Sequence, residues 1–247
     1  MGYSFPNIKI RVYPKTFLKD VHISLYFSEV SIDDNLQKNA SEFFENEFSL
    51  PNIQMEEMPK AVSVFSNDKE IRFAFGLSRA DLSIKREAYR SFEDMKPLLS
   101  KLFNFVSALG LLNVSAIAFS KYNELEYETI DGVSVSDVMG DVFSKDLLKN
   151  MTKREVATQK KLSRWEKVYQ EKGDDETDSL VTIEYGFRKI PIEKGRSSLT
   201  LKSLIESRCG NIDTRNLPDI MVYYNQILDN VFHWSVTNKV LSAMREG

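Results

Sequence analysis

Three short segments, 61–66, 71–77 and 81–85, have the character of β-strands and follow one another with only a few residues between them. In the second segment apolar side chains recur at every other position, the two-residue period of a half-buried strand. Asn67 and Asp68 separate the first two segments and are residue types that favour tight turns. Strands joined so closely pair antiparallel, since a parallel connection needs a crossover of about a dozen residues or more. The segments predict an antiparallel meander, whose sheet can keep one face in water.

The segments on either side of this meander predict a further strand before it and a long helix after it that can pack against the sheet. Residues 21–28 alternate between apolar and polar side chains and predict a further strand. After the meander, Ser91 and Asp94 have the spacing of a helix N-cap and its acidic partner. The apolar residues of 95–109 then share one broad helical face, and Gly110 is a natural C-terminal stop. This region therefore predicts a sheet that buries one face against a long amphipathic helix.

The remaining segments continue the same pattern of strands and amphipathic helices. A Met/Glu/Pro-rich connection precedes the meander, and we expect 173–178 to form an acidic loop. The charged segment 153–172 is interpreted as a helix, with an exposed strand as the alternative. The other predicted elements are helices at 31–50, at 135–150 (one helix or two), from Pro218 and from Thr237, and strands at 114–128, 180–191 and 198–205.

The predicted fold class is α+β, because strands come in runs and do not alternate strictly with helices. Antiparallel sheets, including the β-meander, pack against long amphipathic helices. The elements fall into two roughly repeated halves, an N-terminal one at 1–130 and a C-terminal one at 131–247 that ends in a helix pair. One continuous domain is the alternative. With 42% hydrophobic residues, the 247-residue chain has enough apolar mass for a real core.

The net charge and the cysteine content indicate which partners and which cellular compartment to expect. The formal net charge of −3 and the pI near 5.6 give no global basic field, which proteins bound to nucleic-acid backbone usually carry. The single cysteine, Cys209, excludes an intramolecular disulfide and favours a reducing compartment. The N-terminal residues do not resemble a signal peptide, and no apolar run approaches the roughly 20 residues of a membrane span. We expect a cytoplasmic protein without a membrane partner.

Residues that usually mark a catalytic or cofactor site are scarce. Two histidines and one cysteine exclude the usual zinc patterns, and no glycine-rich phosphate loop is present. We therefore predict no catalytic residue, no metal site and no cofactor. His22, at a polar strand position, and His233, between Phe232 and Trp234, are interpreted as structural or solvent-exposed, and Cys209 as a buried thiol.

An acidic site on the sheet is one alternative, because a metal-dependent nuclease or hydrolase needs only two carboxylates and a lysine brought together. Glu184 does not match the usual acid-x-lysine pair, since Tyr185 and Gly186 follow it. Charged side chains on the wet face of an antiparallel sheet explain the same residues more simply. The residues concerned are Asp81, Lys85, Asp178, Glu184, Arg188 and Lys189.

A basic segment around Trp165 is another alternative, as a contact for nucleic acid or for a protein partner. Basic residues interleaved with an aromatic can bind a nucleic-acid strand. Glu155, Glu166 and Glu171 dilute this charge, so a solvated face with Trp165 packed down is the favoured interpretation. The candidate contact residues are Lys153, Arg154, Lys160, Lys161, Arg164, Trp165 and Lys167.

Three stretches carry a family resemblance: FAFGLSRADLSI at 73–84, YRSFEDMKPLL at 89–99 and VFHWSVTN at 231–238. They resemble a sporadically distributed bacterial family of uncharacterised proteins of about this length, often met in mobile-element or defence-associated gene neighbourhoods. This chain departs from the family at 116–121, where its members often have an Arg-rich strand end. The resemblance implies a part in a bacterial antiviral defence or mobile-element system, and brings no catalytic residues with it.

These observations favour a non-enzymatic protein-interaction component, an accessory, adaptor or scaffold subunit that binds a protein partner or associates with itself as an oligomer. The expectation rests on the missing active-site residues, the aromatic-rich composition with 16 Phe and 10 Tyr, and the resemblance. A metal-dependent nuclease or hydrolase, and a nucleic-acid-binding protein acting through 153–167, are the alternatives.

Overall fold

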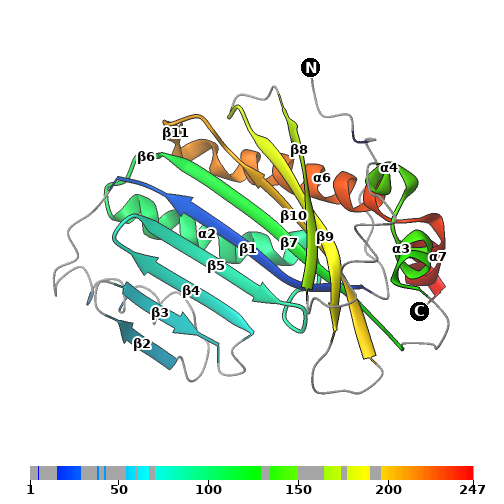
Figure 1. Ribbon diagram of the computed structural model, residues 1–247. Helices are drawn as coiled ribbons and strands as arrows, with labels where there is room; N and C mark the ends of the chain where they lie inside the picture. The colour runs from blue at the N-terminus through cyan, green and yellow to red at the C-terminus, as the bar shows by residue number, and fades with distance from the viewer. Residues whose placement is uncertain are drawn as a thin grey trace.

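The computed structural model describes residues 5, 16–28, 38, 42, 54–58, 61–66, 70–128, 134–149, 164–173, 177–189 and 196–246. Nine of the strands in these residues form one antiparallel sheet, in the order β2-β3-β4-β5-β1-β7-β10-β9-β8 (Figure 1). The strands are β1 (Leu18–Tyr26), β2 (Gln54–Met58), β3 (Ala61–Phe65), β4 (Ile71–Gly76), β5 (Arg79–Lys85), β7 (Ala116–Glu128), β8 (Arg164–Lys172), β9 (Leu180–Lys189) and β10 (Arg196–Glu206).

Strands β1 and β7 form the middle of the sheet and join its two halves. They pair antiparallel, with Ile23 opposite Phe119. On its other side, β1 pairs with β5, the last strand of the first meander. β7 pairs in the same way with β10, the last strand of a second meander formed by β8, β9 and β10. Beyond β5 the sheet continues with β4 and β3, and beyond β10 it continues with β9 and β8, so each meander is met in reverse chain order. The two halves of the sheet, which begin with β1 and β7, thus repeat one strand order, while the predicted division of the chain at residue 130 stays a prediction.

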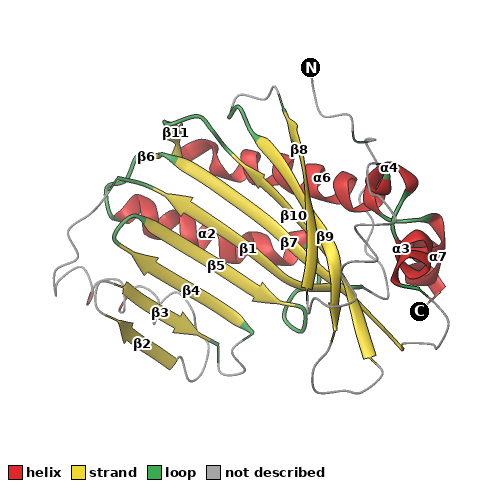
Figure 2. Cartoon of the chain, viewed as in Figure 1, coloured by secondary structure: helices red, strands yellow, loops and turns green. Residues whose placement is uncertain are grey.

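Two long helices cover one face of the sheet (Figure 2). α2 (Phe92–Ala108) follows the first meander and α6 (Leu217–Ser235) follows the second, so each half contributes one helix. Alternate strand residues point towards these helices and form the core, because side chains of a strand alternate between its two faces. Ile23, Phe119 and Leu228 are among the fully buried side chains between the two layers.

Shorter elements close one end of the helix layer and link the strands. α3 (Val135–Val142) and α4 (Lys145–Leu148) lie between β7 and β8 in the chain, and α7 (Asn238–Glu246) follows α6. α3 and α7 pack together beyond the C-terminal end of α6 (Figure 1). At the opposite end, β6 (Asn113–Val114) pairs with β11 (Ile212–Asp213), and the short 3-10 helix η2 (Thr214–Asn216) leads into α6.

The structure confirms the α+β class, the meander and the C-terminal helix pair. It also confirms the boundaries of the long helix α2. The Ser91 hydroxyl oxygen accepts a hydrogen bond from the Asp94 backbone N–H at 3.1 Å. Gly110 follows the last turn with a φ of 77°, a conformation that favours glycine. The segment predicted as one helix or two, 135–150, forms two.

Two segments differ from the leading interpretation of the sequence. Residues 54–58, for which no strand was predicted, form β2, which pairs with β3 at one edge of the sheet. The preferred helix was wrong for residues 164–172, which form the strand that was its alternative, β8, paired with β9 at the other edge. Hydrogen bonding to a neighbouring strand outweighed the local pattern in both segments. The predicted helix at 31–50 lies outside the described residues, apart from Lys38 and Glu42, as does the segment 153–163.

Candidate functional site

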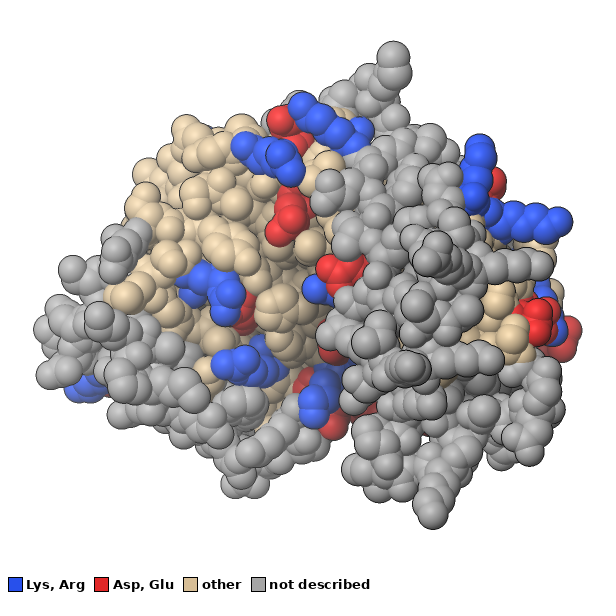
Figure 3. Space-filling model, viewed as in Figure 1, with Lys and Arg blue, Asp and Glu red and all other residues tan. Residues whose placement is uncertain are grey.

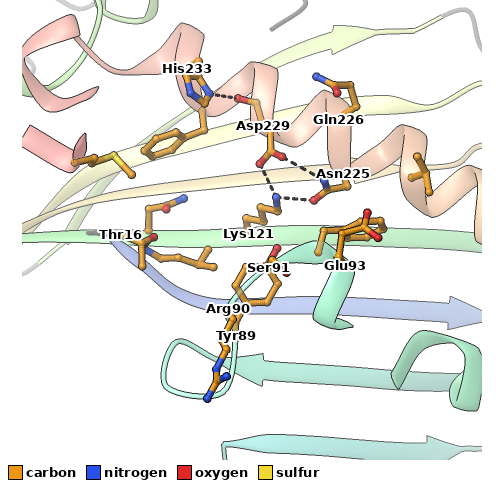
Figure 4. Close-up of a pocket in the computed structure, with 16 residues that line it drawn as sticks. Thr16, Tyr89, Arg90, Ser91, Glu93, Lys121, Asn225, Gln226, Asp229 and His233 are labelled. Atoms are coloured by element: carbon orange, nitrogen blue, oxygen red, sulfur yellow. Dashed lines mark hydrogen bonds and ion pairs between the residues drawn. The ribbon is translucent and has the colours of Figure 1, made fainter. Parts of the chain in front are cut away.

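A cavity of about 300 Å³ lies between the sheet and α6, beside the N-terminal end of α2 (Figure 4). Leu18 of β1 with Lys121 and Asn123 of β7 form its floor. One wall is α6, and the other is the segment that leads into α2, including Tyr89. This volume is at the lower end of the range for small-molecule sites.

Lys121 reaches the cavity because of the alternation along β7. Ile117 and Phe119 are fully buried on the helix-covered face, and Lys121 follows at the same two-residue spacing. Its side chain therefore points between sheet and helix, and the residue is only 7% exposed. Asn123 comes next on the same face and is also buried. The strand thus changes from apolar to polar residues where the cavity begins.

Two residues of α6 hold the Lys121 ammonium in place. Asn225 and Asp229 are four residues apart, so they lie one above the other on the same helix face. The ammonium donates hydrogen bonds to Asn225 Oδ1 at 2.7 Å and to Asp229 Oδ1 at 2.6 Å. The amide of Asn225 donates in turn to Asp229 Oδ2 at 3.2 Å. An ammonium has three hydrogens, and these two bonds are the only ones that Lys121 makes with described residues, so one hydrogen is left for a ligand.

The protonated state of Lys121 follows from the same contacts. Burial by itself lowers the pKa of this ammonium, but the charge of Asp229 and its hydrogen bond outweigh that effect and raise the pKa. The Phe119 ring adds a weak attraction, since its centroid lies 6.0 Å from the nitrogen. A permanently charged lysine is a poor nucleophile and a poor base. Lys121 is therefore equipped to bind an oxygen atom and not to attack a substrate.

Tyr89 adds a second hydrogen-bond donor beside Lys121. Burial raises the pKa of its phenol, and the nearby Lys121 charge partly opposes this shift. The hydroxyl has no hydrogen-bond partner within the described chain, and Figure 4 shows the ring directed towards Lys121. His233 lies farther along α6, where its Nδ1 donates to the Asp229 carbonyl at 2.7 Å. This bond fixes the tautomer of the His233 ring when it is neutral.

The rest of the lining is apolar or balanced in charge. Apolar and polar side chains alternate around the cavity, so the apolar ones can contact the hydrocarbon part of a ligand while the polar ones bind its oxygen. The charged groups besides Lys121 are Arg90, Glu93 and Asp229, which leaves the lining near neutrality when His233 is neutral. The apolar lining residues are Leu18, Phe92, Val222, Phe232 and Met244.

A second polar cluster lies on the opposite, open face of the sheet. His22 of β1 contacts Ser83 of β5 through Nδ1 at 2.6 Å and Ser24 through Nε2 at 3.0 Å. Ser24 donates to Asp81 Oδ1 at 2.6 Å, and Arg79 Nε lies 2.9 Å from the other carboxylate oxygen. Burial alone would raise the pKa of Asp81, but the bonds from His22 and Ser24 and the charge of Arg79 lower it.

The predicted basic contact residues are not gathered into a described site. Lys153, Arg154, Lys160 and Lys161 lie outside the described residues. Arg164, Trp165 and Lys167 occur on the edge strand β8, opposite Arg188, Phe187 and Tyr185 of β9, so the helical face expected for them was wrong. On the face seen in Figure 3, basic and acidic side chains are interspersed, and no continuous basic patch forms among the described atoms.

The acids considered for a metal-dependent site also lie apart. Asp81 is on β5 and Glu184 on β9, four strand positions away, which separates them by about 19 Å across the sheet, and the register adds an offset of four residues along the strands. Asp178 pairs instead with Lys172 at 2.7 Å. In the described part of the chain no group of three or more His, Cys, Asp or Glu could hold a metal ion. Cys209, interpreted as a buried thiol, is only partly buried.

Comparison with known proteins gives one plain result: no protein-family model and no curated protein matches this chain. Among the described helices, none is both long enough and apolar enough to span a membrane.

Sequence reasoning missed the Lys121 site, although part of its signal was present. Ile117, Phe119 and Lys121 have the spacing of one strand face, which places a charge where the core should be. The partners could not be found in this way. Asn225 and Asp229 are more than 100 residues away in sequence, and only the packing of α6 across β7 brings them together.

Proposed function

We propose that the protein binds a small organic molecule through a carbonyl oxygen in the cavity above Lys121. The observation that carries this proposal is the Lys121 ammonium, which is buried, held by Asn225 and Asp229, and left with one N–H. A buried donor that is already fixed in position binds an acceptor oxygen strongly, because binding costs little further side-chain entropy. The Tyr89 hydroxyl is the second donor.

The charge of the lining selects the class of ligand. Lys121 and Arg90 are balanced by Asp229 and Glu93, so a multiply charged anion would meet repulsion as well as attraction. A neutral carbonyl compound, such as an amide, gains the hydrogen bonds without that cost. The apolar walls then favour a flat or branched hydrocarbon body attached to the carbonyl.

Benzamide is a suitable probe, because it joins a primary amide to an aromatic ring of the right size. A ligand of about nine heavy atoms binds with a dissociation constant on the order of 1 mM at ordinary ligand efficiency. We expect saturable shifts of the NMR resonances of Lys121, Tyr89 and Asn225 on titration with benzamide. Benzoate should bind less tightly, and toluene, which lacks the oxygen, should leave these resonances in place.

Two lysine variants make the test specific. Lys121→Met should abolish the benzamide response. Lys239→Met is the matched control, because Lys239 also forms an ion pair, with Asp141 at 2.7 Å, but is exposed and lies outside the cavity lining. Equal responses in the two variants, or no shift of the cavity resonances in the unmodified protein, would show that this site does not bind carbonyl compounds.

Self-association through α6 is the second candidate function, in line with the interaction component expected from the sequence. Val222 is 45% exposed and lies at the edge of the cavity, and the adjacent Tyr223 is 38% exposed. Adjacent exposed apolar side chains that form a contiguous patch can mark a contact with another chain, unlike ones scattered singly. Sedimentation velocity should then show a dimer that Val222→Glu converts to a monomer. A monomer at all concentrations in the unmodified protein would remove this candidate.

A further inference from the structure

The polar cluster on the open face forms a continuous chain of hydrogen bonds from Ser83 to Asp81. The chain runs from Ser83 Oγ to His22 Nδ1, from His22 Nε2 to Ser24 Oγ, and from Ser24 Oγ to Asp81 Oδ1, over distances of 2.6, 3.0 and 2.6 Å. It spans two neighbouring strands, because His22 and Ser24 lie opposite Ser83 and Asp81 in the β1–β5 register. Arg79 closes it with its bond to Asp81.

The direction of each bond follows from what the groups can donate. The Asp81 carboxylate, whose pKa is lowered, can only accept, so the single hydroxyl hydrogen of Ser24 points to it. Ser24 must then accept from His22, which places the ring hydrogen of a neutral His22 on Nε2. The remaining ring nitrogen, Nδ1, is an acceptor, and the Ser83 hydroxyl donates to it. Ser83 is thus a hydroxyl held against a base that a third group orients.

We infer that Ser83 is a nucleophile, activated by His22, that attacks the carbonyl carbon of small carboxylic esters on the open face of the sheet. The inference is independent of the cavity above Lys121, which lies on the other face. Access supports it, since the His22 side chain is 37% exposed and Ser83 is partly exposed. Ser24 and Asp81 are buried beneath them and act as positioning residues.

The reaction balances with water as the only other reactant. Ser83 Oγ bonds to the acyl carbon while its proton moves to His22 Nδ1, and the charged ring is stabilised by Asp81, 3.5 Å from Nε2. The ester C–O bond then breaks, and the leaving oxygen takes that proton to depart as an alcohol. Water attacks the acyl-serine in the same way, which yields a carboxylic acid and returns the hydrogen to Ser83.

Arg72 of β4 is the basic residue paired with Ser83 in the sheet. It lies directly opposite Ser83 in the β4–β5 register, and its guanidinium donates to Ser63 Oγ at 3.1 Å. Directly paired side chains on one face of a sheet are about 5 Å apart at Cβ. To stabilise the negative charge that develops on the carbonyl oxygen during attack, the guanidinium would have to turn from Ser63 of β3 towards Ser83.

A fluorophosphonate probe tests the nucleophile directly, because attack by a serine oxygen releases fluoride and leaves a stable bond to phosphorus. We expect mass spectrometry to find one adduct, on Ser83, and p-nitrophenyl acetate to be hydrolysed slowly. Ser83→Ala should remove both signals. His22→Gln should lower the labelling rate at least about 100-fold, since it removes the base. Circular dichroism melting curves confirm that the variants are folded.

Ser120→Ala is the matched control. Ser120 flanks His22 from the other side, opposite it in the β1–β7 register, but is not hydrogen-bonded to it. The variant should therefore label at the original rate. A protein without an adduct on Ser83, or one that labels equally well in His22→Gln, would overturn the inference.

The positioning role of Ser24 has a separate readout. Ser24→Ala breaks the chain between His22 and Asp81 and should slow labelling at least about tenfold, with the adduct still on Ser83. Ser24→Thr keeps the hydroxyl and should restore much of the rate. An unchanged rate in Ser24→Ala would show that the chain does not orient His22.

Discussion

Lys121 and Asp229 join the centre of the sheet to the helix that covers it, with 2.6 Å between Nζ and Oδ1. The pair Lys239 and Asp141 has almost the same length, 2.7 Å, but its side chains are 73% and 66% exposed. For the first pair the corresponding values are 9% and 21%. Water screens the exposed pair and is largely excluded from the buried one, so similar geometry has different energetic consequences.

Removing Lys121 should destabilise the protein far more than removing Lys239. Lys121→Met leaves the Asp229 carboxylate partly buried without its cation, and the free energy of unfolding should fall by about 3 kcal/mol. Lys239→Met should change it by less than about 1 kcal/mol. Urea denaturation followed by circular dichroism measures both.

The double variant Lys121→Met/Asp229→Leu tests the physical reason for that loss. If the loss comes from an unpaired charge, replacing both charges with apolar side chains should recover most of the stability. A double variant less stable than Lys121→Met alone would mean that packing, and not charge, accounts for the effect.

The same pair predicts how stability changes at high pH. The pKa of Lys121 is raised above its ordinary value of 10.5 in the folded protein. The ion pair therefore contributes fully below pH 10.5, and its contribution is lost as the pH rises through the folded-state pKa. The stability difference between the unmodified protein and Lys121→Met should be constant from pH 7 to 9 and should shrink above pH 10.5. Urea titrations across this range check it, and a difference that grows with pH would contradict the sign.

Elements specified by neighbouring residues could be predicted from the sequence. The start of α2 depends on Ser91 and Asp94, and its end on Gly110, all within or next to the helix itself. The meander follows from turns of a few residues between β3, β4 and β5. Such features need no knowledge of distant parts of the chain, which is why their pattern was sufficient.

Elements that depend on distant residues could not be predicted from the sequence. In β8 the apolar residues Trp165, Val168 and Tyr169 have nearly helical spacing, so the local pattern fits a helix or a strand, and the pairing with β9 decides for the strand. The open-face cluster arises because β1 pairs with β5, which places His22 beside Ser83, 61 residues later in the chain. The sequence correctly placed His22 at a polar position of a strand, but it could not identify the residues that His22 is hydrogen-bonded to. Both candidate sites thus depend on strand and helix pairings that local patterns do not encode.

The N-cap of α2 gives a prediction about local stability. Ser91→Ala removes the side-chain oxygen that accepts from the Asp94 N–H, and should lower the free energy of unfolding by about 1 kcal/mol. Ser107→Ala is the matched control, because Ser107 is exposed within the same helix. Alanine has the higher helix propensity, so the control should be neutral or slightly stabilising. Equal losses in both variants would mean that Ser91 does not act as a cap.

Asp81 and Asp20, on the paired strands β5 and β1, should affect acid stability with opposite signs. The pKa of Asp81 is lowered from 3.8, because hydrogen bonds from His22 and Ser24 and the charge of Arg79 outweigh its burial. Its contribution to stability is present above pH 3.8 and is lost as the pH falls through the folded-state pKa. Asp81→Asn should therefore be less stable than the unmodified protein at pH 6, by a margin that shrinks below pH 4.

Asp20 provides the contrast, because burial is the largest influence on its carboxyl and raises the pKa above 3.8. Its charged form is disfavoured in the folded state, and this cost grows as the pH rises from 3.8 through the raised pKa. Asp20→Asn should then be more stable than the unmodified protein at pH 6, and the gain should disappear in acid. Urea unfolding of both variants between pH 3 and 7 decides the matter. Differences of the same sign would mean that the two carboxyls do not occupy the distinct environments that the β1–β5 register gives them.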